Sequence, residues 1–123
     1  MIINFEEYTV DLSHEELAMA PFLSVELFKI LQPDVVIRQK TLCNMLNKAI
    51  RNKDGLFTKL NLNEARLRKF FNYYRSQGMM PIIASKDGCS ISYEREIISK
   101  QILSLEQRAR ATMSAANGMR RFL

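Results

Sequence analysis

Residues 63–78, NEARLRKFFNYYRSQG, contain the side chains best suited to bind another molecule. If this segment is a helix with 100° per residue, its large apolar side chains share one sector of about 100° and its polar side chains lie on the other side. The apolar sector, which is predicted to be buried, consists of Leu67, Phe70, Phe71 and Tyr74. Burial of this sector would hold the polar side chains outward in a fixed array.

The polar side of this helix has the residue types that bind duplex DNA. Arginine and lysine bind phosphates and guanine edges, asparagine binds adenine, and tyrosine binds phosphate oxygens. An α-helix also fits into the major groove. The predicted DNA contacts on this helix are Arg66, Arg68, Lys69, Asn72, Tyr73 and Arg75.

Basic residues outside this helix extend the predicted DNA-binding surface. The predicted contacts there are Arg38, Lys40, Lys59 and Lys86, and Lys48, Arg51 and Lys53 add positive charge nearby. The first 37 residues contain seven acidic residues and one lysine, whereas the remainder contains 17 basic and 6 acidic residues. Such a division is typical of a protein whose basic face binds a polyanion. The acidic end would then face away from the polyanion or bind a partner. The alternative is a solvated surface without a ligand.

Local sequence signals divide the chain into the elements that would position these residues. Ser13 and Glu16 form a capping box, which predicts a helix directly after it, while Pro21 favours a later start or a kink. Residues 35–37, Val-Val-Ile, predict one short strand. Residues 40–53 predict a second, amphipathic helix.

The second half of the chain has signals for a helix, a hairpin and a long helix. Asn61 is predicted to cap the DNA-contacting helix and Gly78 to end it. Two β-like runs on either side of residues 85–88, Ser-Lys-Asp-Gly, predict a β-hairpin. Residues 94–117 predict a long C-terminal helix whose end frays at Gly118. Its apolar residues alternate in spacing between four and three, as in a coiled coil: Ile98, Ile102, Leu105, Ala109, Thr112, Ala116 and Met119.

The order of these elements predicts the fold class. It is an α+β, mostly helical arrangement in a single domain over residues 1–123, with residues 1–12 as an N-terminal arm. Helix, short strand, two helices and a hairpin are the order of a winged helix-turn-helix, with a three-helix core and the strand paired to the hairpin wing. The long C-terminal helix is expected either to pack on the first helix or to pair with a second copy, which would make a homodimer.

Residues 56–111 resemble small winged-helix proteins encoded by bacteriophages and prophages. The resemblance rests on an arginine three residues before a helix-ending glycine, an apolar strand, a serine and a glycine at the hairpin, an acidic helix start, and a later Ser-Leu-x-x-Arg. The matching residues are Arg75 and Gly78, Ile82 and Ile83, Ser85 and Gly88, Glu94 and Glu96, then Ser104, Leu105 and Arg108. The resemblance implies a DNA-binding module that acts in replication initiation, excision or regulation.

No arrangement typical of an enzyme, metal site or cofactor site occurs in the sequence. His14 is the only histidine, so a Ser-His-Asp or Cys-His arrangement lacks a second candidate base. Glu15 and Glu16 are expected to be solvated, and Cys43 and Cys89 are predicted to be free thiols at small hydrophobic positions. We therefore predict a protein without catalytic residues, metal, cofactor or small-molecule substrate.

Two hypotheses about function follow. The first is a double-stranded DNA-binding protein of phage or mobile-element type that acts in transcription regulation, excision or replication. The alternative is a winged-helix protein-interaction module that binds or inhibits a host protein, which the acidic first 37 residues favour. No apolar run approaches the ~20 residues of a membrane-spanning helix, and the start of the chain is acidic, so a cytoplasmic protein without a membrane partner is expected.

Overall fold

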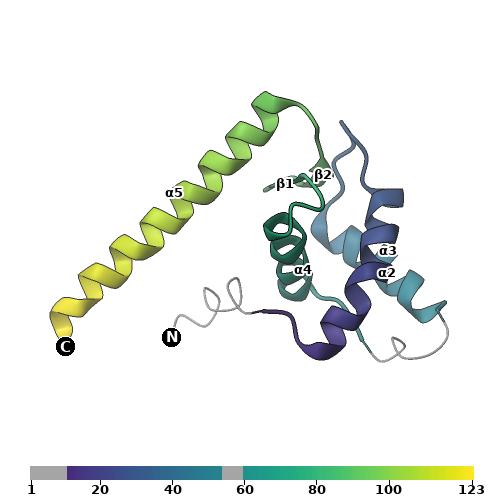
Figure 1. The fold of residues 1–123 in the computed structure, drawn as a ribbon, viewed down its shortest axis with the longest axis horizontal. Helices are drawn as coiled ribbons and strands as arrows, with labels where there is room; N and C mark the ends of the chain where they lie inside the picture. Colours follow the sequence, from purple (N-terminus) through teal and green to yellow (C-terminus); the bar gives the residue numbers. More distant parts are fainter. Residues whose placement is uncertain (1–10, 54–59) are drawn as a thin grey trace. The chain divides into compact units, whose positions relative to one another are not determined.

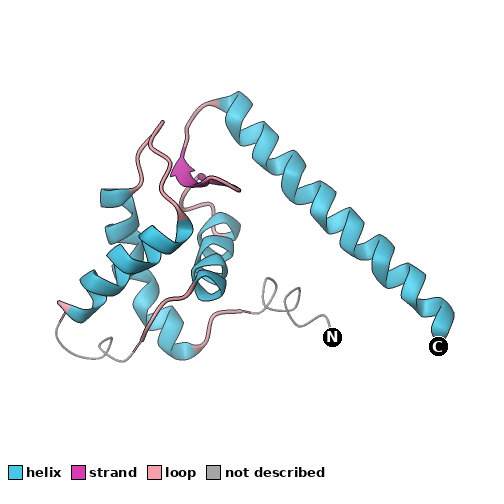
Figure 2. Cartoon of the chain, turned by 180° about the vertical axis from the view of Figure 1, so that it is seen from behind, coloured by secondary structure: helices cyan, strands magenta, loops and turns pink. Residues whose placement is uncertain are grey.

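The computed structural model describes residues 11–53 and 60–123. The chain divides into one unit that ends at Ser92 and a second unit, Tyr93–Leu123. The first contains α2 (His14–Ile30), α3 (Gln39–Arg51), α4 (Glu64–Ser76), β1 (Ile82–Ser85) and β2 (Gly88–Ile91), and the second contains α5 (Arg95–Met119) and the 3₁₀ helix η1 (Arg120–Phe122) (Figure 1). Figure 2 shows that helices dominate and that the strands form one small sheet, which confirms the predicted α+β, mostly helical class.

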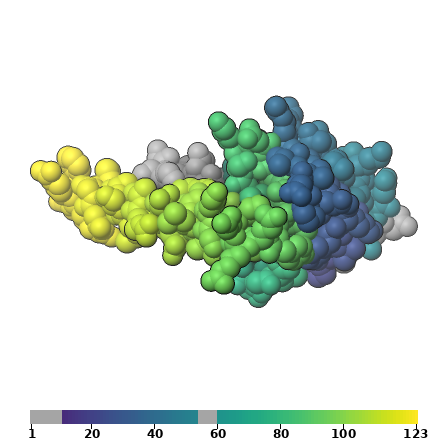
Figure 3. Space-filling model, turned by 90° about the horizontal axis from the view of Figure 1, so that it is seen from above, coloured from purple at the N-terminus to yellow at the C-terminus, as the bar shows by residue number. Residues whose placement is uncertain are grey.

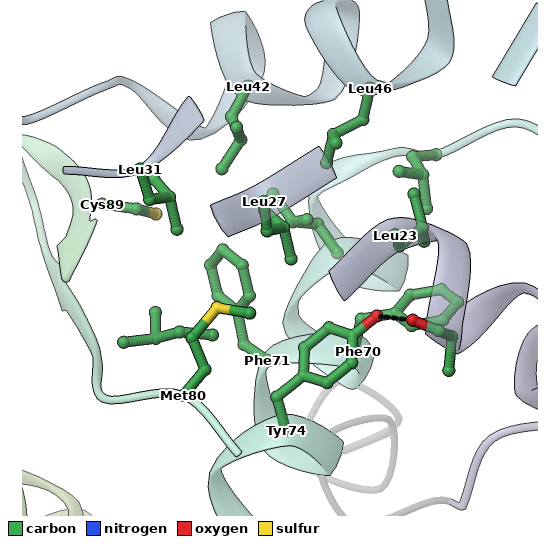
Figure 4. Close-up of a cluster of buried hydrophobic side chains, with 14 of the residues drawn as sticks. Leu23, Leu27, Leu31, Leu42, Leu46, Phe70, Phe71, Tyr74, Met80 and Cys89 are labelled. Atoms are coloured by element: carbon green, nitrogen blue, oxygen red, sulfur yellow. Dashed lines mark hydrogen bonds between the residues drawn. The ribbon is translucent and has the colours of Figure 1, made fainter. Parts of the chain in front are cut away.

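Three helices of the first unit bury one face each around a common core. In Figure 4, Leu23 and Leu27 of α2 lie with Leu42 and Leu46 of α3 near the rings of α4. The predicted buried sector of α4 is confirmed, because all of its members are at most 1% exposed: Leu67, Phe70, Phe71 and Tyr74.

Helix α2 begins where the capping box predicts. The Ser13 hydroxyl accepts a hydrogen bond from the Glu16 amide at 3.2 Å, and a Glu16 carboxylate oxygen accepts one from the Ser13 amide at 2.8 Å. Pro21 lies inside the helix, so the later start is wrong. Beside Pro21, the Tyr74 hydroxyl donates to the Ala20 carbonyl at 2.7 Å, the bond drawn as a dashed line in Figure 4. This bond ties α2 to α4.

Helix α4 begins two residues later than predicted, with Asn63 rather than Asn61 as its cap. The Asn63 side chain accepts a hydrogen bond from the Arg66 amide at 2.8 Å. The reason lies in α3, where the buried Asn47 side chain bonds both backbone groups of Leu62, at 2.7 Å to its N–H and 2.9 Å to its C=O. Because Leu62 is held in this way, the helix starts only after it.

Gly78 ends α4, as predicted. It has a φ of 65°, a conformation that glycine adopts without strain. Its amide donates to the Arg75 carbonyl at 3.0 Å, and the Met79 amide donates to the Tyr74 carbonyl at 2.9 Å. These two bonds form a Schellman motif, which satisfies carbonyls at the end of the helix.

The predicted hairpin is confirmed, but its turn differs in register. Ser85 pairs with Gly88, so Lys86 and Asp87 form the turn and Gly88 belongs to β2. Of the predicted strand 35–37, only Ile37 pairs with the hairpin: its N–H donates to the Cys89 carbonyl at 2.9 Å, and the Cys89 N–H donates to the Ile37 carbonyl at 2.7 Å. One residue therefore joins the segment before α3 to the sheet.

Helix α5 runs without interruption through Gly118 to Met119, where η1 follows, so the helix continues past its predicted end at residue 117. None of the residues of α5 is buried. Among the described ranges, 11–53 and 60–123, no helix combines the length and apolarity that a membrane crossing requires.

Candidate nucleic-acid interface

Arg66 and Lys69, on the polar side of α4, form ion pairs with a buried carboxylate of α2. Lys69 Nζ lies 2.9 Å from Glu16 Oε1, and Arg66 Nε lies 3.1 Å from Glu16 Oε2. The side chain of Glu16 is 2% exposed, whereas those of Lys69 and Arg66 are 20% and 39% exposed. The expectation that Glu16 is solvated is therefore wrong, because two cations from α4 replace its water.

Glu16 serves two helices at once. Its Oε1 accepts hydrogen bonds from the Ser13 amide, which starts α2, and from Lys69 Nζ. Its Oε2 accepts no hydrogen bond, and the charge of Arg66 alone holds it. Arg66 Nη1 donates its own hydrogen bond to the Asn61 carbonyl, at 3.1 Å. Burial raises the pKa of Glu16, but the hydrogen bonds from Ser13 and Lys69 and the charge of Lys69 outweigh burial, so its pKa lies below the usual value. Glu16 is ionised at neutral pH.

The other two arginines of α4 bind oxygens of neighbouring elements. Arg75 Nε and Nη2 donate to the Ile82 carbonyl at 3.1 and 3.0 Å, which joins the end of α4 to β1. Arg68 Nη1 donates to Gln39 Oε1 at 3.4 Å, which joins α4 to the start of α3. Both arginines therefore help to position the elements around α4.

Asn72 and Tyr73 complete the predicted contacts on α4. The ring of Tyr73 packs edge to face against Tyr74, with centroids 5.7 Å apart. All six predicted contacts on α4 are only half-exposed. Ion pairs, hydrogen bonds and ring contacts therefore occupy part of the polar side of this helix.

Three predicted contacts outside α4 are exposed, and backbone pairing brings their segments together. Arg38 is the cap residue of α3, Lys40 lies in the first turn of that helix, and Lys86 lies in the hairpin turn. The pairing of Ile37 with Cys89 places Arg38 beside Gly88, and both segments reach the surface in Figure 3, blue before α3 and green at the hairpin.

Gly88 is required for the close approach of the hairpin to the backbone of Ile37 and Arg38. A Cβ atom there would lie 2.3 Å from the Ile37 carbonyl oxygen and 2.9 Å from the Arg38 nitrogen. Its φ of 138° also falls in a region that favours glycine.

Helix α3 adds basic residues that the sequence prediction did not assign to the site. Four of its exposed positions repeat at intervals of four, four and three and follow one side of the helix: Lys40, Asn44, Lys48 and Arg51. The helix contains no acidic residue. No ion pair within the described part of the chain includes a residue of α3. The spacing of these residues is the signal that could have assigned Lys48 and Arg51 to the site.

This surface, named here the α3–hairpin patch, consists of Arg38, Lys40, Lys48, Arg51 and Lys86. Its side chains can donate hydrogen bonds to phosphate oxygens, and the first-turn amides of α3 lack a side-chain cap that would satisfy them. Lys59 was also predicted to contact DNA, and it lies outside the described residues.

Other chemistry has little support among the described residues. No group of three or more His, Cys, Asp or Glu side chains within residues 11–53 and 60–123 is placed to hold a metal ion. Cys43 and Cys89 are free and buried, as predicted, and burial raises the pKa of each thiol to about 11. Both thiols are therefore protonated at neutral pH and poor nucleophiles.

Comparison of the chain with protein-family models, curated proteins and solved structures finds no match. Its function must therefore be inferred from the geometry and charges described above.

Proposed function

We propose that this chain is a winged-helix protein that binds double-stranded DNA. The observation that carries the proposal is the α3–hairpin patch, in which the pairing of Ile37 with Cys89 joins the two segments that carry the exposed cations. Phosphate contacts of this kind supply most of the affinity of a protein for duplex DNA. The order of α2, Ile37, α3, α4 and the hairpin matches that of a winged helix.

Within this proposal, α4 is the helix that enters the major groove. Such a helix is positioned by phosphate contacts on either side of it. Arg38 and Lys40 before α4 and Lys86 after it would make these contacts. Asn72 is the proposed base-edge contact and Tyr73 a proposed contact to a phosphate oxygen. Arg66 and Lys69 are assigned chiefly to Glu16 because both form ion pairs with it.

The resemblance of residues 56–111 to phage and prophage proteins extends the proposal. On this ground we propose that the chain acts in transcription regulation, excision or replication, in the cytoplasm of a bacterial host.

The proposal is tested by measuring affinity for a random-sequence duplex by fluorescence anisotropy between about 50 and 200 mM salt. The double variant Arg38→Ala/Lys40→Ala should bind more weakly, and the slope of log K against log salt should become shallower by about 2. A matched control is Lys100→Ala/Arg110→Ala, which removes the same charge from exposed residues of α5, outside the patch. The control should leave the slope close to that of the parent protein.

Two outcomes would contradict the proposal. Absence of binding at the lowest salt concentration would exclude DNA as the ligand. An equal change of slope in both double variants would show that net charge, rather than the α3–hairpin patch, determines the affinity.

A further inference from the structure

Helix α2 is apolar on two opposite sides. Its inner side packs into the core with side chains that are fully buried: Met19, Leu23 and Leu27. Its outer side exposes Leu17 at 41%, Val25 at 52% and Phe28 at 45%. A surface helix normally has one apolar side and one polar side. A helix that is apolar all round usually has other parts of a protein packed on every side.

The exposed residues of α2 form one continuous strip. Leu17, Pro21, Val25 and Phe28 follow at intervals of four, four and three, so that they fall within about 80° around the helix axis. The name outer strip is used for these four residues. An apolar strip of this kind marks an interaction surface when it is rimmed by polar residues.

The charges along one edge of the outer strip show which partner fits it. Glu15 lies near the start of α2 and Lys29 near its end, and both are exposed. Their positions are fourteen residues apart, or about 21 Å along the axis of α2. Their directions around this axis differ by about 40°. Lys29 Nζ lies 3.1 Å from Glu26 Oε2, yet its side chain stays 66% exposed and accessible to a further acid.

We propose that the outer strip binds the outer strip of a second copy of this chain, with the two α2 helices antiparallel. A two-fold contact requires a surface that is complementary to itself. The outer strip meets this requirement because it has an acid near one end and a base near the other. A two-fold rotation about an axis near Phe22 brings Glu15 of each copy to Lys29 of the other. A uniformly acidic or basic partner would match only one end.

The size of the outer strip sets the strength of this dimer. Three large side chains, each about half exposed, form a smaller interface than stable dimers have, so the association is weak and concentration-dependent. Pro21 and Val25 lie at its centre, where short side chains let two helices approach closely.

Sedimentation velocity of the full chain, without DNA, tests the proposal from low micromolar concentration to the highest soluble concentration. A reversible monomer–dimer equilibrium is expected. Val25→Glu should raise the dissociation constant about tenfold or more, because it places a charge at the centre of the contact. Circular dichroism checks that this exposed substitution leaves the fold intact.

A charge reversal distinguishes this contact from other modes of association. Glu15→Lys alone and Lys29→Glu alone should each weaken the dimer, since each places like charges together, and the double variant should restore it. The matched control is Leu103→Glu on α5, a residue that is 49% exposed, which should leave the dimer unchanged.

A monomer at every concentration overturns the proposal. A dimer that Leu103→Glu dissolves and Val25→Glu leaves intact also overturns it, because α5 would then form the contact. Neither outcome affects the proposed DNA binding, which is measured separately.

Discussion

The Glu16 carboxylate has partners in two helices, so its charge affects more than the start of α2. It pairs with Arg66 and Lys69 and accepts the hydrogen bond that completes the capping box. Removing one partner of a buried ion pair is costly, since the remaining charges lose their compensation. Glu16 is therefore expected to contribute to the stability of the fold and to the positioning of α4.

The variant Glu16→Gln keeps the shape of the side chain and removes its charge. We expect the free energy of unfolding at neutral pH to fall by about 1–3 kcal/mol. Because the folded-state pKa of Glu16 is lowered, its stabilising effect is complete above the unfolded value of about 4.3 and is lost as the pH falls through the folded value. Urea unfolding should thus show a difference between parent and variant that shrinks from neutral pH to about pH 3.

Glu15→Gln is the matched control, because Glu15 is the exposed neighbour of Glu16. It should change the free energy of unfolding by less than about 0.5 kcal/mol. A Glu16→Gln effect of the same size at neutral and acidic pH would show that shape, and not charge, accounts for the role of this residue.

At the scale of elements, the single pairing between Ile37 and Cys89 connects α3 to the hairpin. The two hydrogen bonds of this pair hold the segment before α3 against β2. The α3–hairpin patch depends on this connection, because Arg38 directly follows Ile37 and Lys86 lies in the turn that precedes β2.

The variant Gly88→Ala should break this connection. Its Cβ would overlap backbone atoms of Ile37, which cannot move aside as a flexible side chain can. We expect Ile37 and Cys89 to lose amide protection in hydrogen exchange and the affinity for DNA to fall.

Gly78→Ala is the control for Gly88→Ala. Gly78 also has a positive φ, but a Cβ there would meet no atom within 4 Å. This control should cost about 1 kcal/mol of stability and leave the pairing of Ile37 intact. Unchanged protection of Ile37 in Gly88→Ala would contradict the proposed need for close approach.

The elements that sequence alone predicted are those with local signals. The capping box at Ser13, the glycine that ends α4 and the hairpin all depend on residues within a few positions of one another. The cap of α4 was misplaced because the decisive contact comes from Asn47, 15 residues before Leu62. Likewise, the register of the hairpin turn follows from the approach of Ile37, which is distant in sequence.

At the scale of the whole molecule, charge was harder to interpret than apolar pattern. Periodicity identified the buried face of α4 because burial follows the helix repeat. The sequence also showed that α4 is rich in cations, but not that Glu16, 53 residues before Lys69, forms ion pairs with two of them. It named the cations of α3 without showing that the segment before this helix pairs with the hairpin. Which charges remain available to a ligand is decided by tertiary contacts.

The two buried thiols report on opening of the whole core. Because burial raises the pKa of Cys43 and Cys89 to about 11, almost no thiolate is present at pH 8, and neither sulfur is accessible. We expect a chromogenic disulfide reagent to react slowly in native buffer. Both thiols should then become reactive together across the urea unfolding transition.

Fast reaction of either thiol in native buffer would contradict cooperative protection of the core. Reaction of Cys89 before Cys43 would show instead that the hairpin opens before the helices, as local unfolding allows.

The short contact at Ile37 also bears on how the chain avoids association through its sheet. A strand edge with unpaired backbone groups is a template for another strand. Ile37 covers the edge of β2 at Cys89, the strands are only four residues long, and Lys86 places a charge at the turn. Loss of the glycine at position 88 would uncover that edge, so aggregation by strand addition is an expected cost of disturbing this one backbone pair.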